Sequence, residues 1–295
     1  MADLSVKIAG VEFKNPVMVA SGTFGSGAEY GEFVDLNRLG AVVTKGVANV
    51  PWEGNPTPRI AETYGGMLNA VGLQNPGYDL FAKRDIPYLQ NYDTNVIVNV
   101  CGRTMEDYID VVEKLGHESV DMLEINISCP NVKHGGIAFG QDPKAVEAIT
   151  KAVKAVAKQP VIMKLSPNVT DITEMARAAE AGGADALSLI NTLTGMQIDV
   201  ERQKFVLANK TGGLSGPAIK PVAVRMVYQV ANAVKVPIIG MGGIASAKDA
   251  LEFILAGATA VSVGTANFNN PNTTIEVIEG IEDYMTRHGV EDINN

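Results

Sequence analysis

Cysteine and positive charge are both scarce in this sequence. Its 295 residues include two cysteines, Cys101 and Cys129, too few for a disulfide framework, a cysteine-rich zinc site or an iron–sulfur cluster with four thiolate ligands. Lysine and arginine number 24 against 33 aspartates and glutamates, so the formal net charge is −9. A nucleic-acid-binding protein needs a basic face to neutralise phosphates, and the charge balance argues against that class.

Long hydrophobic runs and several common motifs are also missing. No uninterrupted apolar run reaches the ~18 residues that a membrane-spanning helix needs, and the first ten residues, MADLSVKIAG, have neither the basic nor the apolar region of a signal peptide. The sequence has no metal-ligand spacing such as HExxH, no GxGxxG fingerprint and no GxxxxGK[ST] loop. We therefore expect a cytoplasmic protein that needs no membrane, no nucleic acid and no metal.

Short apolar runs bounded by turn residues recur along the chain. Hydrophobic residues make up 46% of the sequence, enough for a sizeable core. Continuous apolar runs of about five residues are typical of parallel strands that are buried on both faces. Eight such runs predict strands at Pro16–Ala20, Ala41–Lys45, Asn95–Val100, Met122–Ser128, Val161–Leu165, Ala186–Asn191, Pro237–Met241 and Ala260–Gly264.

Helical patterns separate most of these strands. Apolar residues at spacings of three and four predict helices at Met105–Lys114, Pro143–Ala157, Asp171–Ala181, Pro221–Val234 and Ala247–Ala256. A strand followed by a helix, repeated eight times, is a (β/α)8 TIM barrel, and the length suits one barrel with insertions. We therefore predict a single α/β domain over residues 1–295.

Three further segments fall outside the basic repeat. Val6 to Phe13 alternates around Ala9-Gly10 and predicts a β-hairpin that closes the barrel bottom. The connections 46–92 and 192–220 are longer than a barrel requires. Because long loops without structure are rare, we expect both connections to form lids or short hairpins over the top face.

Polar side chains gather where the predicted strands end. Barrel enzymes place their chemistry at the C-terminal ends of the strands. The residues at these ends include two lysines and several asparagines, namely Ser21, Lys45, Asn99, Asn126, Lys164, Asn191 and Thr192. Any one asparagine is commonly a turn residue that satisfies the local backbone, but convergence from several strands favours a site.

Glycine-rich turns follow the last two predicted strands. Gly240-Met-Gly-Gly-Ile-Ala-Ser and Gly264-Thr-Ala-Asn each lead toward a helix. Barrels bind phosphate at this position, where glycine lets the backbone approach the ligand closely. Tight turns without a ligand explain either sequence alone better than they explain both together. We expect a phosphorylated ligand, in the form of a mononucleotide-sized cofactor.

Lysine and cysteine side chains allow more than one chemistry. Lys45 and Lys164 are costly inside a barrel mouth unless they meet negative charge, such as a reduced cofactor or an acidic substrate, but a lysine can also form a Schiff base with a carbonyl. A buried inert thiol is the usual state of cysteine, and we expect it for Cys101. The polar neighbours of Cys129 and the glycine-containing loop after it favour a chemical role for that thiol.

Four motifs together closely resemble dihydroorotate dehydrogenase: Val43-Thr-Lys-Gly46, Asn69-Ala-Val-Gly-Leu-Gln-Asn-Pro-Gly77, Asn126-Ile-Ser-Cys-Pro-Asn131 and Ile239-Gly-Met-Gly-Gly-Ile244. The resemblance covers essentially the whole chain. It implies a barrel that carries one FMN and oxidises dihydroorotate to orotate in pyrimidine (UMP) biosynthesis. It also implies that Cys129 removes the proton from C5 while hydride leaves C6 for flavin N5, and that Lys164 stabilises the reduced flavin.

The resemblance further implies two sets of binding residues. FMN would be bound by Ser21, Lys45, Gly46, Asn99, Asn126, Lys164, Ile190, Gly216, Gly242, Gly243, Gly264 and Thr265. The substrate would be bound by Lys45, Asn69, Ala70, Val71, Gly72, Leu73, Asn126, Asn131, Asn191 and Thr192. Asparagine suits a pyrimidine dione because its amide both donates and accepts hydrogen bonds.

The segment from Pro58 to Gly77 resembles the NAD-linked class 1B of these enzymes. That class implies a homodimer core joined to electron-transfer subunits that carry FAD and a [2Fe-2S] cluster, a heterotetramer. Four alternatives remain: the fumarate-linked class 1A homodimer, a Schiff-base aldolase using Lys164 or Lys45, a non-catalytic scaffold, and the similar pyrimidine-reducing domain of dihydropyrimidine dehydrogenase.

Overall fold

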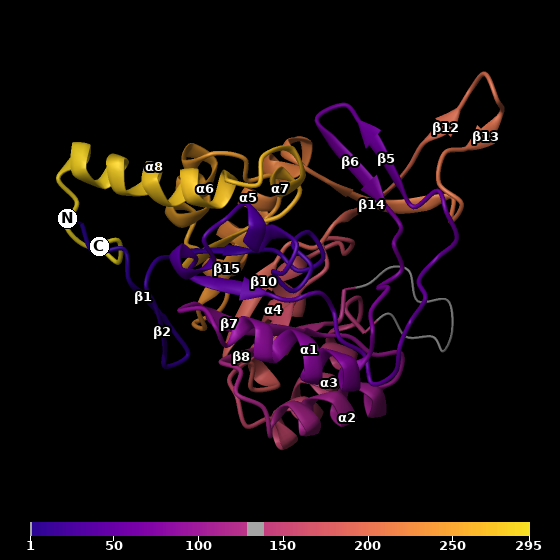
Figure 1. Ribbon diagram of the computed structural model, residues 1–295, viewed down its shortest axis with the longest axis horizontal. Helices are drawn as coiled ribbons and strands as arrows, with labels where there is room; N and C mark the ends of the chain where they lie inside the picture. The colour runs from indigo at the N-terminus through magenta and orange to yellow at the C-terminus, as the bar shows by residue number, and fades with distance from the viewer. Residues whose placement is uncertain (1, 129–138) are drawn as a thin grey trace.

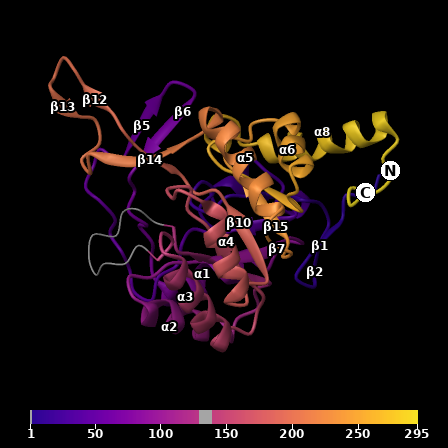
Figure 2. The ribbon, with the colours of Figure 1, turned by 180° about the vertical axis from the view of Figure 1, so that it is seen from behind.

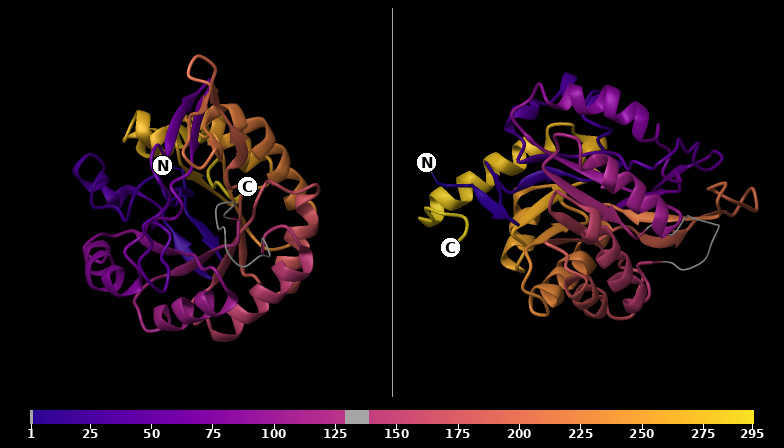
Figure 3. Two further views of the ribbon diagram at one scale, coloured as in Figure 1. Left: turned by 90° about the vertical axis from the view of Figure 1, so that its right-hand side faces the viewer. Right: turned by 90° about the horizontal axis from the view of Figure 1, so that it is seen from below.

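Eight parallel strands close into a barrel in the computed structural model, which describes residues 2–128 and 139–295. The strands are β3 (Val17–Val19), β4 (Ala41–Val43), β7 (Asn95–Val100), β8 (Met122–Asn126), β9 (Val161–Lys164), β10 (Ala186–Leu189), β15 (Ile238–Met241) and β16 (Ala260–Val263). Each lies within one of the eight apolar runs, so the predicted strands and the (β/α)8 fold are confirmed. Helices surround the barrel (Figure 3), which explains why almost every barrel-strand residue is buried.

Five of the helices lie where the sequence pattern predicts them, and three were not predicted. Those around the barrel are α1 (Tyr78–Leu89), α2 (Met105–Leu115), α3 (Pro143–Val156), α4 (Ile172–Ala181), α5 (Lys220–Ala231), α6 (Ala247–Leu255), α7 (Ala266–Asn269) and α8 (Thr273–His288). The five predicted helices are α2 to α6. Side chains of Thr104, Asp142, Asp171 and Ser246 cap four of them by accepting a hydrogen bond from a first-turn backbone N–H.

The expectation of a helix after every strand is wrong between β3 and β4. The described chain there forms only two 3-10 turns, η1 (Tyr30–Glu32) and η2 (Leu36–Arg38). Gly22, Gly25 and Gly27 precede them, all with φ between +55° and +95°. Backbone in this left-handed region cannot continue a right-handed helix, so the chain turns instead of forming a regular crossover.

A β-hairpin covers the N-terminal end of the barrel, as predicted. It consists of β1 (Val6–Ile8) and β2 (Val11–Phe13). Val6, Ile8 and Phe13 pack in one cluster with residues that begin several barrel strands, including Ala41, Met122, Ala186 and Ala260. The hairpin therefore fills the barrel interior from below.

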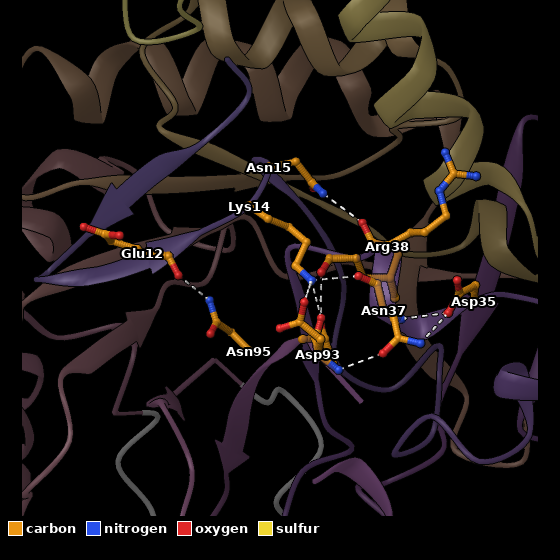
Figure 4. Close-up of polar contacts among 10 residues, drawn as sticks. Glu12, Lys14, Asn15, Asp35, Asn37, Arg38, Asp93 and Asn95 are labelled. Atoms are coloured by element: carbon orange, nitrogen blue, oxygen red, sulfur yellow. Dashed lines mark hydrogen bonds and ion pairs between the residues drawn. The ribbon is translucent and has the colours of Figure 1, made fainter. Parts of the chain in front are cut away.

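Polar contacts fasten this hairpin to the neighbouring loops (Figure 4). Lys14 Nζ donates to the carbonyl of Asn37 at 2.8 Å and to Asp93 Oδ2 at 2.7 Å, and it also contacts the Asp93 carbonyl. Asn15 Nδ2 donates to the Arg38 carbonyl at 2.8 Å. These bonds join the segments that lead into β3, β4 and β7, so the lower end of the barrel is closed by hydrogen bonds as well as by apolar packing.

The two long connections form one sheet. Strands β5 (Ile60–Thr63) and β6 (Gly66–Asn69) come from the first connection, and β11 (Leu193–Met196) and β14 (Thr211–Ser215) come from the second. They form an antiparallel sheet in the order β11-β14-β6-β5, and β12 (Ile198–Asp199) pairs with β13 (Lys204–Phe205) as a separate hairpin. This confirms the expected hairpins. The sheet lies at the end of the molecule opposite the two termini (Figures 1 and 2).

Candidate active site

A cavity lies where the insertion sheet meets the C-terminal ends of the barrel strands. Residues at the ends of β8, β9 and β15 and just after β3, β4, β10 and β16 line it from the barrel, and residues of β6 and β14 line it from the sheet. The predicted binding residues that line this cavity are Ser21, Lys45, Asn69, Val71, Gly72, Leu73, Asn126, Lys164, Ile190, Asn191, Thr192, Gly216, Gly242, Gly243, Gly264 and Thr265. The structure thus brings most of the predicted set into one space.

Three predicted residues in the described part of the chain, Gly46, Ala70 and Asn99, are not among the residues that line the cavity. Asn99 is fully buried in β7, and a side chain at Gly46 would place its Cβ 3.0 Å from Asn99 Oδ1. These two residues therefore lie against each other. Ala70 packs with Leu68 and Leu207 in a small apolar cluster. Cys129 and Asn131 lie outside the described residues.

A buried polar network crosses the barrel beneath the cavity. Glu124, on β8, has only 2% of its surface exposed. Its Oε1 accepts a hydrogen bond from Asn99 Nδ2 at 2.6 Å and lies 3.6 Å from Lys164 Nζ, while its Oε2 accepts from Ser188 Oγ at 2.8 Å. These residues belong to β7, β8, β9 and β10, which are adjacent in the barrel. The network holds a lysine, itself 4% exposed, at the floor of the cavity.

Amide side chains form a second polar group on the wall. Asn191 Nδ2 donates to Ser128 Oγ at 2.5 Å, and Ser128 Oγ donates to Asn126 Oδ1 at 3.0 Å. Asn191 Oδ1 in turn accepts from the Thr192 N–H at 2.8 Å. Because the oxygen of the Asn126 amide is already used, its Nδ2 is the half that can serve a ligand.

The segment Asn69–Leu73 is held in place by Asn55. The N–H of Asn55 donates to the Val71 carbonyl and its Nδ2 donates to the Ala70 carbonyl, both at 3.0 Å. Gly72 has φ +78°, and a Cβ there would lie 2.8 Å from Asn55 N. Glycine is therefore required at position 72, and the segment has a fixed shape on the cavity wall.

Glycines form a cradle at another part of the cavity. Gly216, Gly242 and Gly243 have φ of +103°, +126° and +81°. A Cβ at Gly243 would lie 2.7 Å from the Gly216 carbonyl oxygen, so the two backbone segments touch. Thr265 Oγ1 donates to Ser215 Oγ at 2.7 Å, and α7 begins directly after Thr265. This is the location at which barrels bind phosphate.

Charged side chains support the cradle from behind. Asp249 Oδ2 accepts from the Ala245 N–H at 3.0 Å and from Ser246 Oγ at 2.9 Å, and its Oδ1 accepts from Lys220 Nζ at 2.6 Å. Burial raises the pKa of Asp249, but the hydrogen bonds from Lys220, Ala245 and Ser246 outweigh it, and the pKa lies below its ordinary value. Hydrogen bonds to Asp249 and Glu252 raise the pKa of Lys220.

Sequence reasoning missed several residues of the site. Glu124 is the most important, and its signal was a carboxylate within an otherwise apolar run, where charged side chains are rarely buried without a partner. Asn168, whose Nδ2 donates to the Thr192 carbonyl at 3.1 Å, was missed as well. The other lining residues are ordinary in sequence and reach the cavity only through the fold: Ala20, Gly22, Thr23, Ile60, Met67, Ser215, Ile219, Met241, Ser262 and Phe268.

The described part of the chain contains neither a cluster of metal-ligating side chains nor a helix that could span a membrane. Within residues 2–128 and 139–295, no group of three or more His, Cys, Asp or Glu side chains is arranged to hold a metal ion. No helix in the described part of the chain combines the length and the apolar character needed to span a membrane.

Fold and cavity together define a (β/α)8-barrel protein whose mouth combines a glycine cradle, two lysines and several asparagines. A sequence-family model described as dihydroorotate dehydrogenase matches residues 3–285. The chain belongs to the dihydroorotate dehydrogenase family.

Individual relatives agree with this assignment. The chain is 72% identical over 291 residues to a protein of Lachnoclostridium phytofermentans and 69% identical over 291 residues to one of Alkaliphilus metalliredigens. Both are named dihydroorotate dehydrogenase B (NAD(+)), catalytic subunit, and the matches cover 99% of this chain and 97% and 96% of theirs. The fold is similar to a crystal structure of DHODH from Eimeria tenella in complex with ferulenol, with a TM-score of 0.82, 25% identity, and coverage of 99% of this chain and 86% of that one.

Proposed function

We propose that this chain catalyses the FMN-dependent oxidation of dihydroorotate to orotate in pyrimidine biosynthesis, as the catalytic subunit of an NAD-linked enzyme. The observation that carries the proposal is one cavity in which a phosphate-type glycine cradle and a cluster of lysine and asparagine side chains occur together. FMN, when bound, supplies a hydride acceptor at N5.

Residues of the cavity fit the two ends of FMN. Its phosphate would meet Gly242, Gly243, Gly264 and Thr265, with Gly216 beside them. Its isoalloxazine ring would lie near Lys164 and Lys45, which offset the negative charge of the reduced ring, and near Ser21, Gly46, Asn126 and Ile190. Asn99 Oδ1 is a buried acceptor without a hydrogen-bond partner among the described residues, and the flavin ring carries an N–H donor.

Amides and one thiol would act on the substrate. Asn69, Asn126, Asn191 and Thr192, together with Ala70 to Leu73, Lys45 and Asn131, would bind the ring and carboxylate of dihydroorotate. Cys129 would act as the general base that removes the C5 proton as the C6 hydride leaves. The position of Cys129 directly after β8 and Ile127-Ser128 supports this role, because barrel chemistry occurs at the ends of the strands.

A partner subunit would take the electrons onward. The relatives at 72% and 69% identity are both named as a catalytic subunit of the NAD(+) class, which favours class 1B over the fumarate-linked homodimer. Two cysteines in the whole chain are too few for an iron–sulfur cluster with four thiolates. The FAD and the [2Fe-2S] cluster would therefore belong to the partner, joined to a homodimer of this chain.

Replacement of the proposed base tests the reaction directly. Cys129→Ala should retain FMN, but its flavin should be reduced by dihydroorotate about 10²- to 10⁴-fold more slowly, the usual contribution of a general base. Anaerobic stopped-flow absorbance measures this rate. Cys101→Ala, which removes the other thiol, is the matched control and should react like the parent. Equal rates for Cys129→Ala and the parent would show that the base is another group.

A further inference from the structure

The carboxylate of Glu124 has no role in the proposed function, although it is buried and pairs with Lys164 at the floor of the cavity. Its side chain is 2% exposed and that of Lys164 is 5% exposed, and 3.6 Å separates Oε1 from Nζ. Breaking such a buried pair is costly, because one charge is then left without compensation. The chain therefore holds a negative charge at a fixed place directly beneath the floor of the cavity.

Two hydrogen bonds fix the carboxylate itself. Asn99 Nδ2 donates to Oε1 at 2.6 Å, and Ser188 Oγ donates to Oε2 at 2.8 Å. With one donor on each oxygen, the carboxylate cannot rotate without losing a bond. Lys164 is thereby anchored on one side by a group that is anchored in turn by strands β7 and β10.

The same contact decides how Asn99 is oriented. An amide has a donor end and an acceptor end, and Nδ2 must face the carboxylate. Asn99 Oδ1 therefore points elsewhere, and this buried atom has no hydrogen-bond partner within the described residues. Glu124 thus fixes both the position of a cation at the cavity and the direction of a buried acceptor.

We propose that Glu124 is a positioning residue that anchors Lys164 and Asn99 toward the flavin and, through its charge, lowers the reduction potential of the flavin. This inference rests on the proposed FMN site. Reduction at neutral pH places negative charge on the flavin ring, which Lys164 favours and Glu124 opposes. The opposing charges of the two residues together set the reduction potential of the flavin, so that the reduced flavin is stabilised but can still pass its electrons on.

Removal of the charge at constant volume gives the sharpest test. Glu124→Gln keeps the shape and removes the charge; its oxygen can still accept from Asn99 Nδ2, while its Nε2 must donate to Ser188 Oγ instead of accepting from it. Glu124→Met fills the same space without hydrogen bonding. For each FMN-loaded full-length variant, an anaerobic titration against a dye of known potential measures the flavin midpoint. In both variants the midpoint potential of the flavin should rise by at least about 30 mV. For a two-electron couple this is a tenfold shift of the equilibrium toward the reduced flavin.

Asp185→Asn is the matched control. Asp185 is also paired with a lysine, since Lys154 Nζ donates to its Oδ2 at 2.6 Å. The same oxygen accepts from the N–H of Val161, the first residue of β9, so this pair lies at the end of the barrel opposite the cavity. The flavin equilibrium of Asp185→Asn should stay within threefold of the parent. A purely structural role for Glu124 would likewise leave the potential unchanged.

Each outcome has a definite meaning. If the Glu124 variants fold and their flavin reduction equilibrium stays within threefold of the parent value, the inference is overturned and the proposed function stays intact. Failure of both variants to fold would show that Glu124 serves the stability of the barrel, and would also contradict the inference. A parent chain that does not bind FMN would overturn the proposed function and this inference together.

Discussion

Asp249 links the loop behind the glycine cradle to α5 and α6. Its carboxylate accepts hydrogen bonds from the Ala245 N–H and Ser246 Oγ, which lie just before α6, and from Lys220 Nζ at the start of α5. These contacts lower its pKa. A carboxyl group whose pKa is depressed in the folded state stabilises the protein above its unfolded pKa of about 3.9, and this stability is lost as the pH falls through the folded value.

Asp249→Asn should therefore lower the Tm by a constant amount between about pH 5 and pH 7. Below about pH 4 the difference from the parent should shrink, because the parent carboxyl becomes protonated. Calorimetry across this pH range measures the effect. Glu201→Gln, at an exposed carboxylate, should leave the Tm nearly unchanged. A difference for Asp249→Asn that persists unchanged to pH 3 would show that charge is not the cause.

Prediction from sequence at this scale succeeded where the strand end determines what a side chain faces. Lys45, Asn126 and Lys164 follow that rule and line the cavity. It failed for Glu124 because the three groups that surround its carboxylate come from three other strands. Spacing along one strand contains no information about such partners.

The glycine turn after β15 is the element that shapes the cradle. Gly243 combines φ +81° with a neighbouring carbonyl oxygen 2.7 Å from the position of a Cβ. A side chain at this position would push the turn away from Gly216, so the two segments could no longer enclose a phosphate together.

Gly243→Ala should weaken FMN binding by at least tenfold, as measured by fluorescence titration of the chain after the flavin has been removed. The control is Gly289→Ala, since Gly289 at the end of α8 also has a positive φ of +68° but nothing within 4 Å of a Cβ. That variant should lose about 1 to 2 kcal/mol of stability, because a residue with a Cβ is disfavoured in the left-handed region, and it should keep its FMN affinity. Equal affinities for all three proteins would mean that the phosphate binds elsewhere.

Elements with a strong periodic pattern were predictable, whereas irregular ones were not. All eight strands and helices α2 to α6 agree with the sequence within a few residues. Helix α1 contains Pro87, which weakens its pattern because proline disfavours a helix interior. The crossover from β3 to β4 was predicted wrongly, since its positive-φ glycines were not weighed against the expected repeat.

At the scale of the whole molecule, two insertions far apart in the sequence complete the site. Leu68 on β6 pairs with Leu214 on β14, so residues from both connections face the barrel mouth together. The lengths of the connections predicted hairpins, but not that these hairpins would join into one sheet, because strand pairing depends on contacts that local sequence does not encode.

The central claim is that this cavity binds FMN and that dihydroorotate reduces it. The most direct measurement is an anaerobic visible spectrum of the purified FMN-loaded chain, recorded before and after addition of dihydroorotate and then of NAD. We predict a yellow protein that dihydroorotate bleaches, and whose colour NAD restores only when the electron-transfer subunit is present. A chain that binds no FMN, or whose yellow colour persists after dihydroorotate is added, would contradict the account.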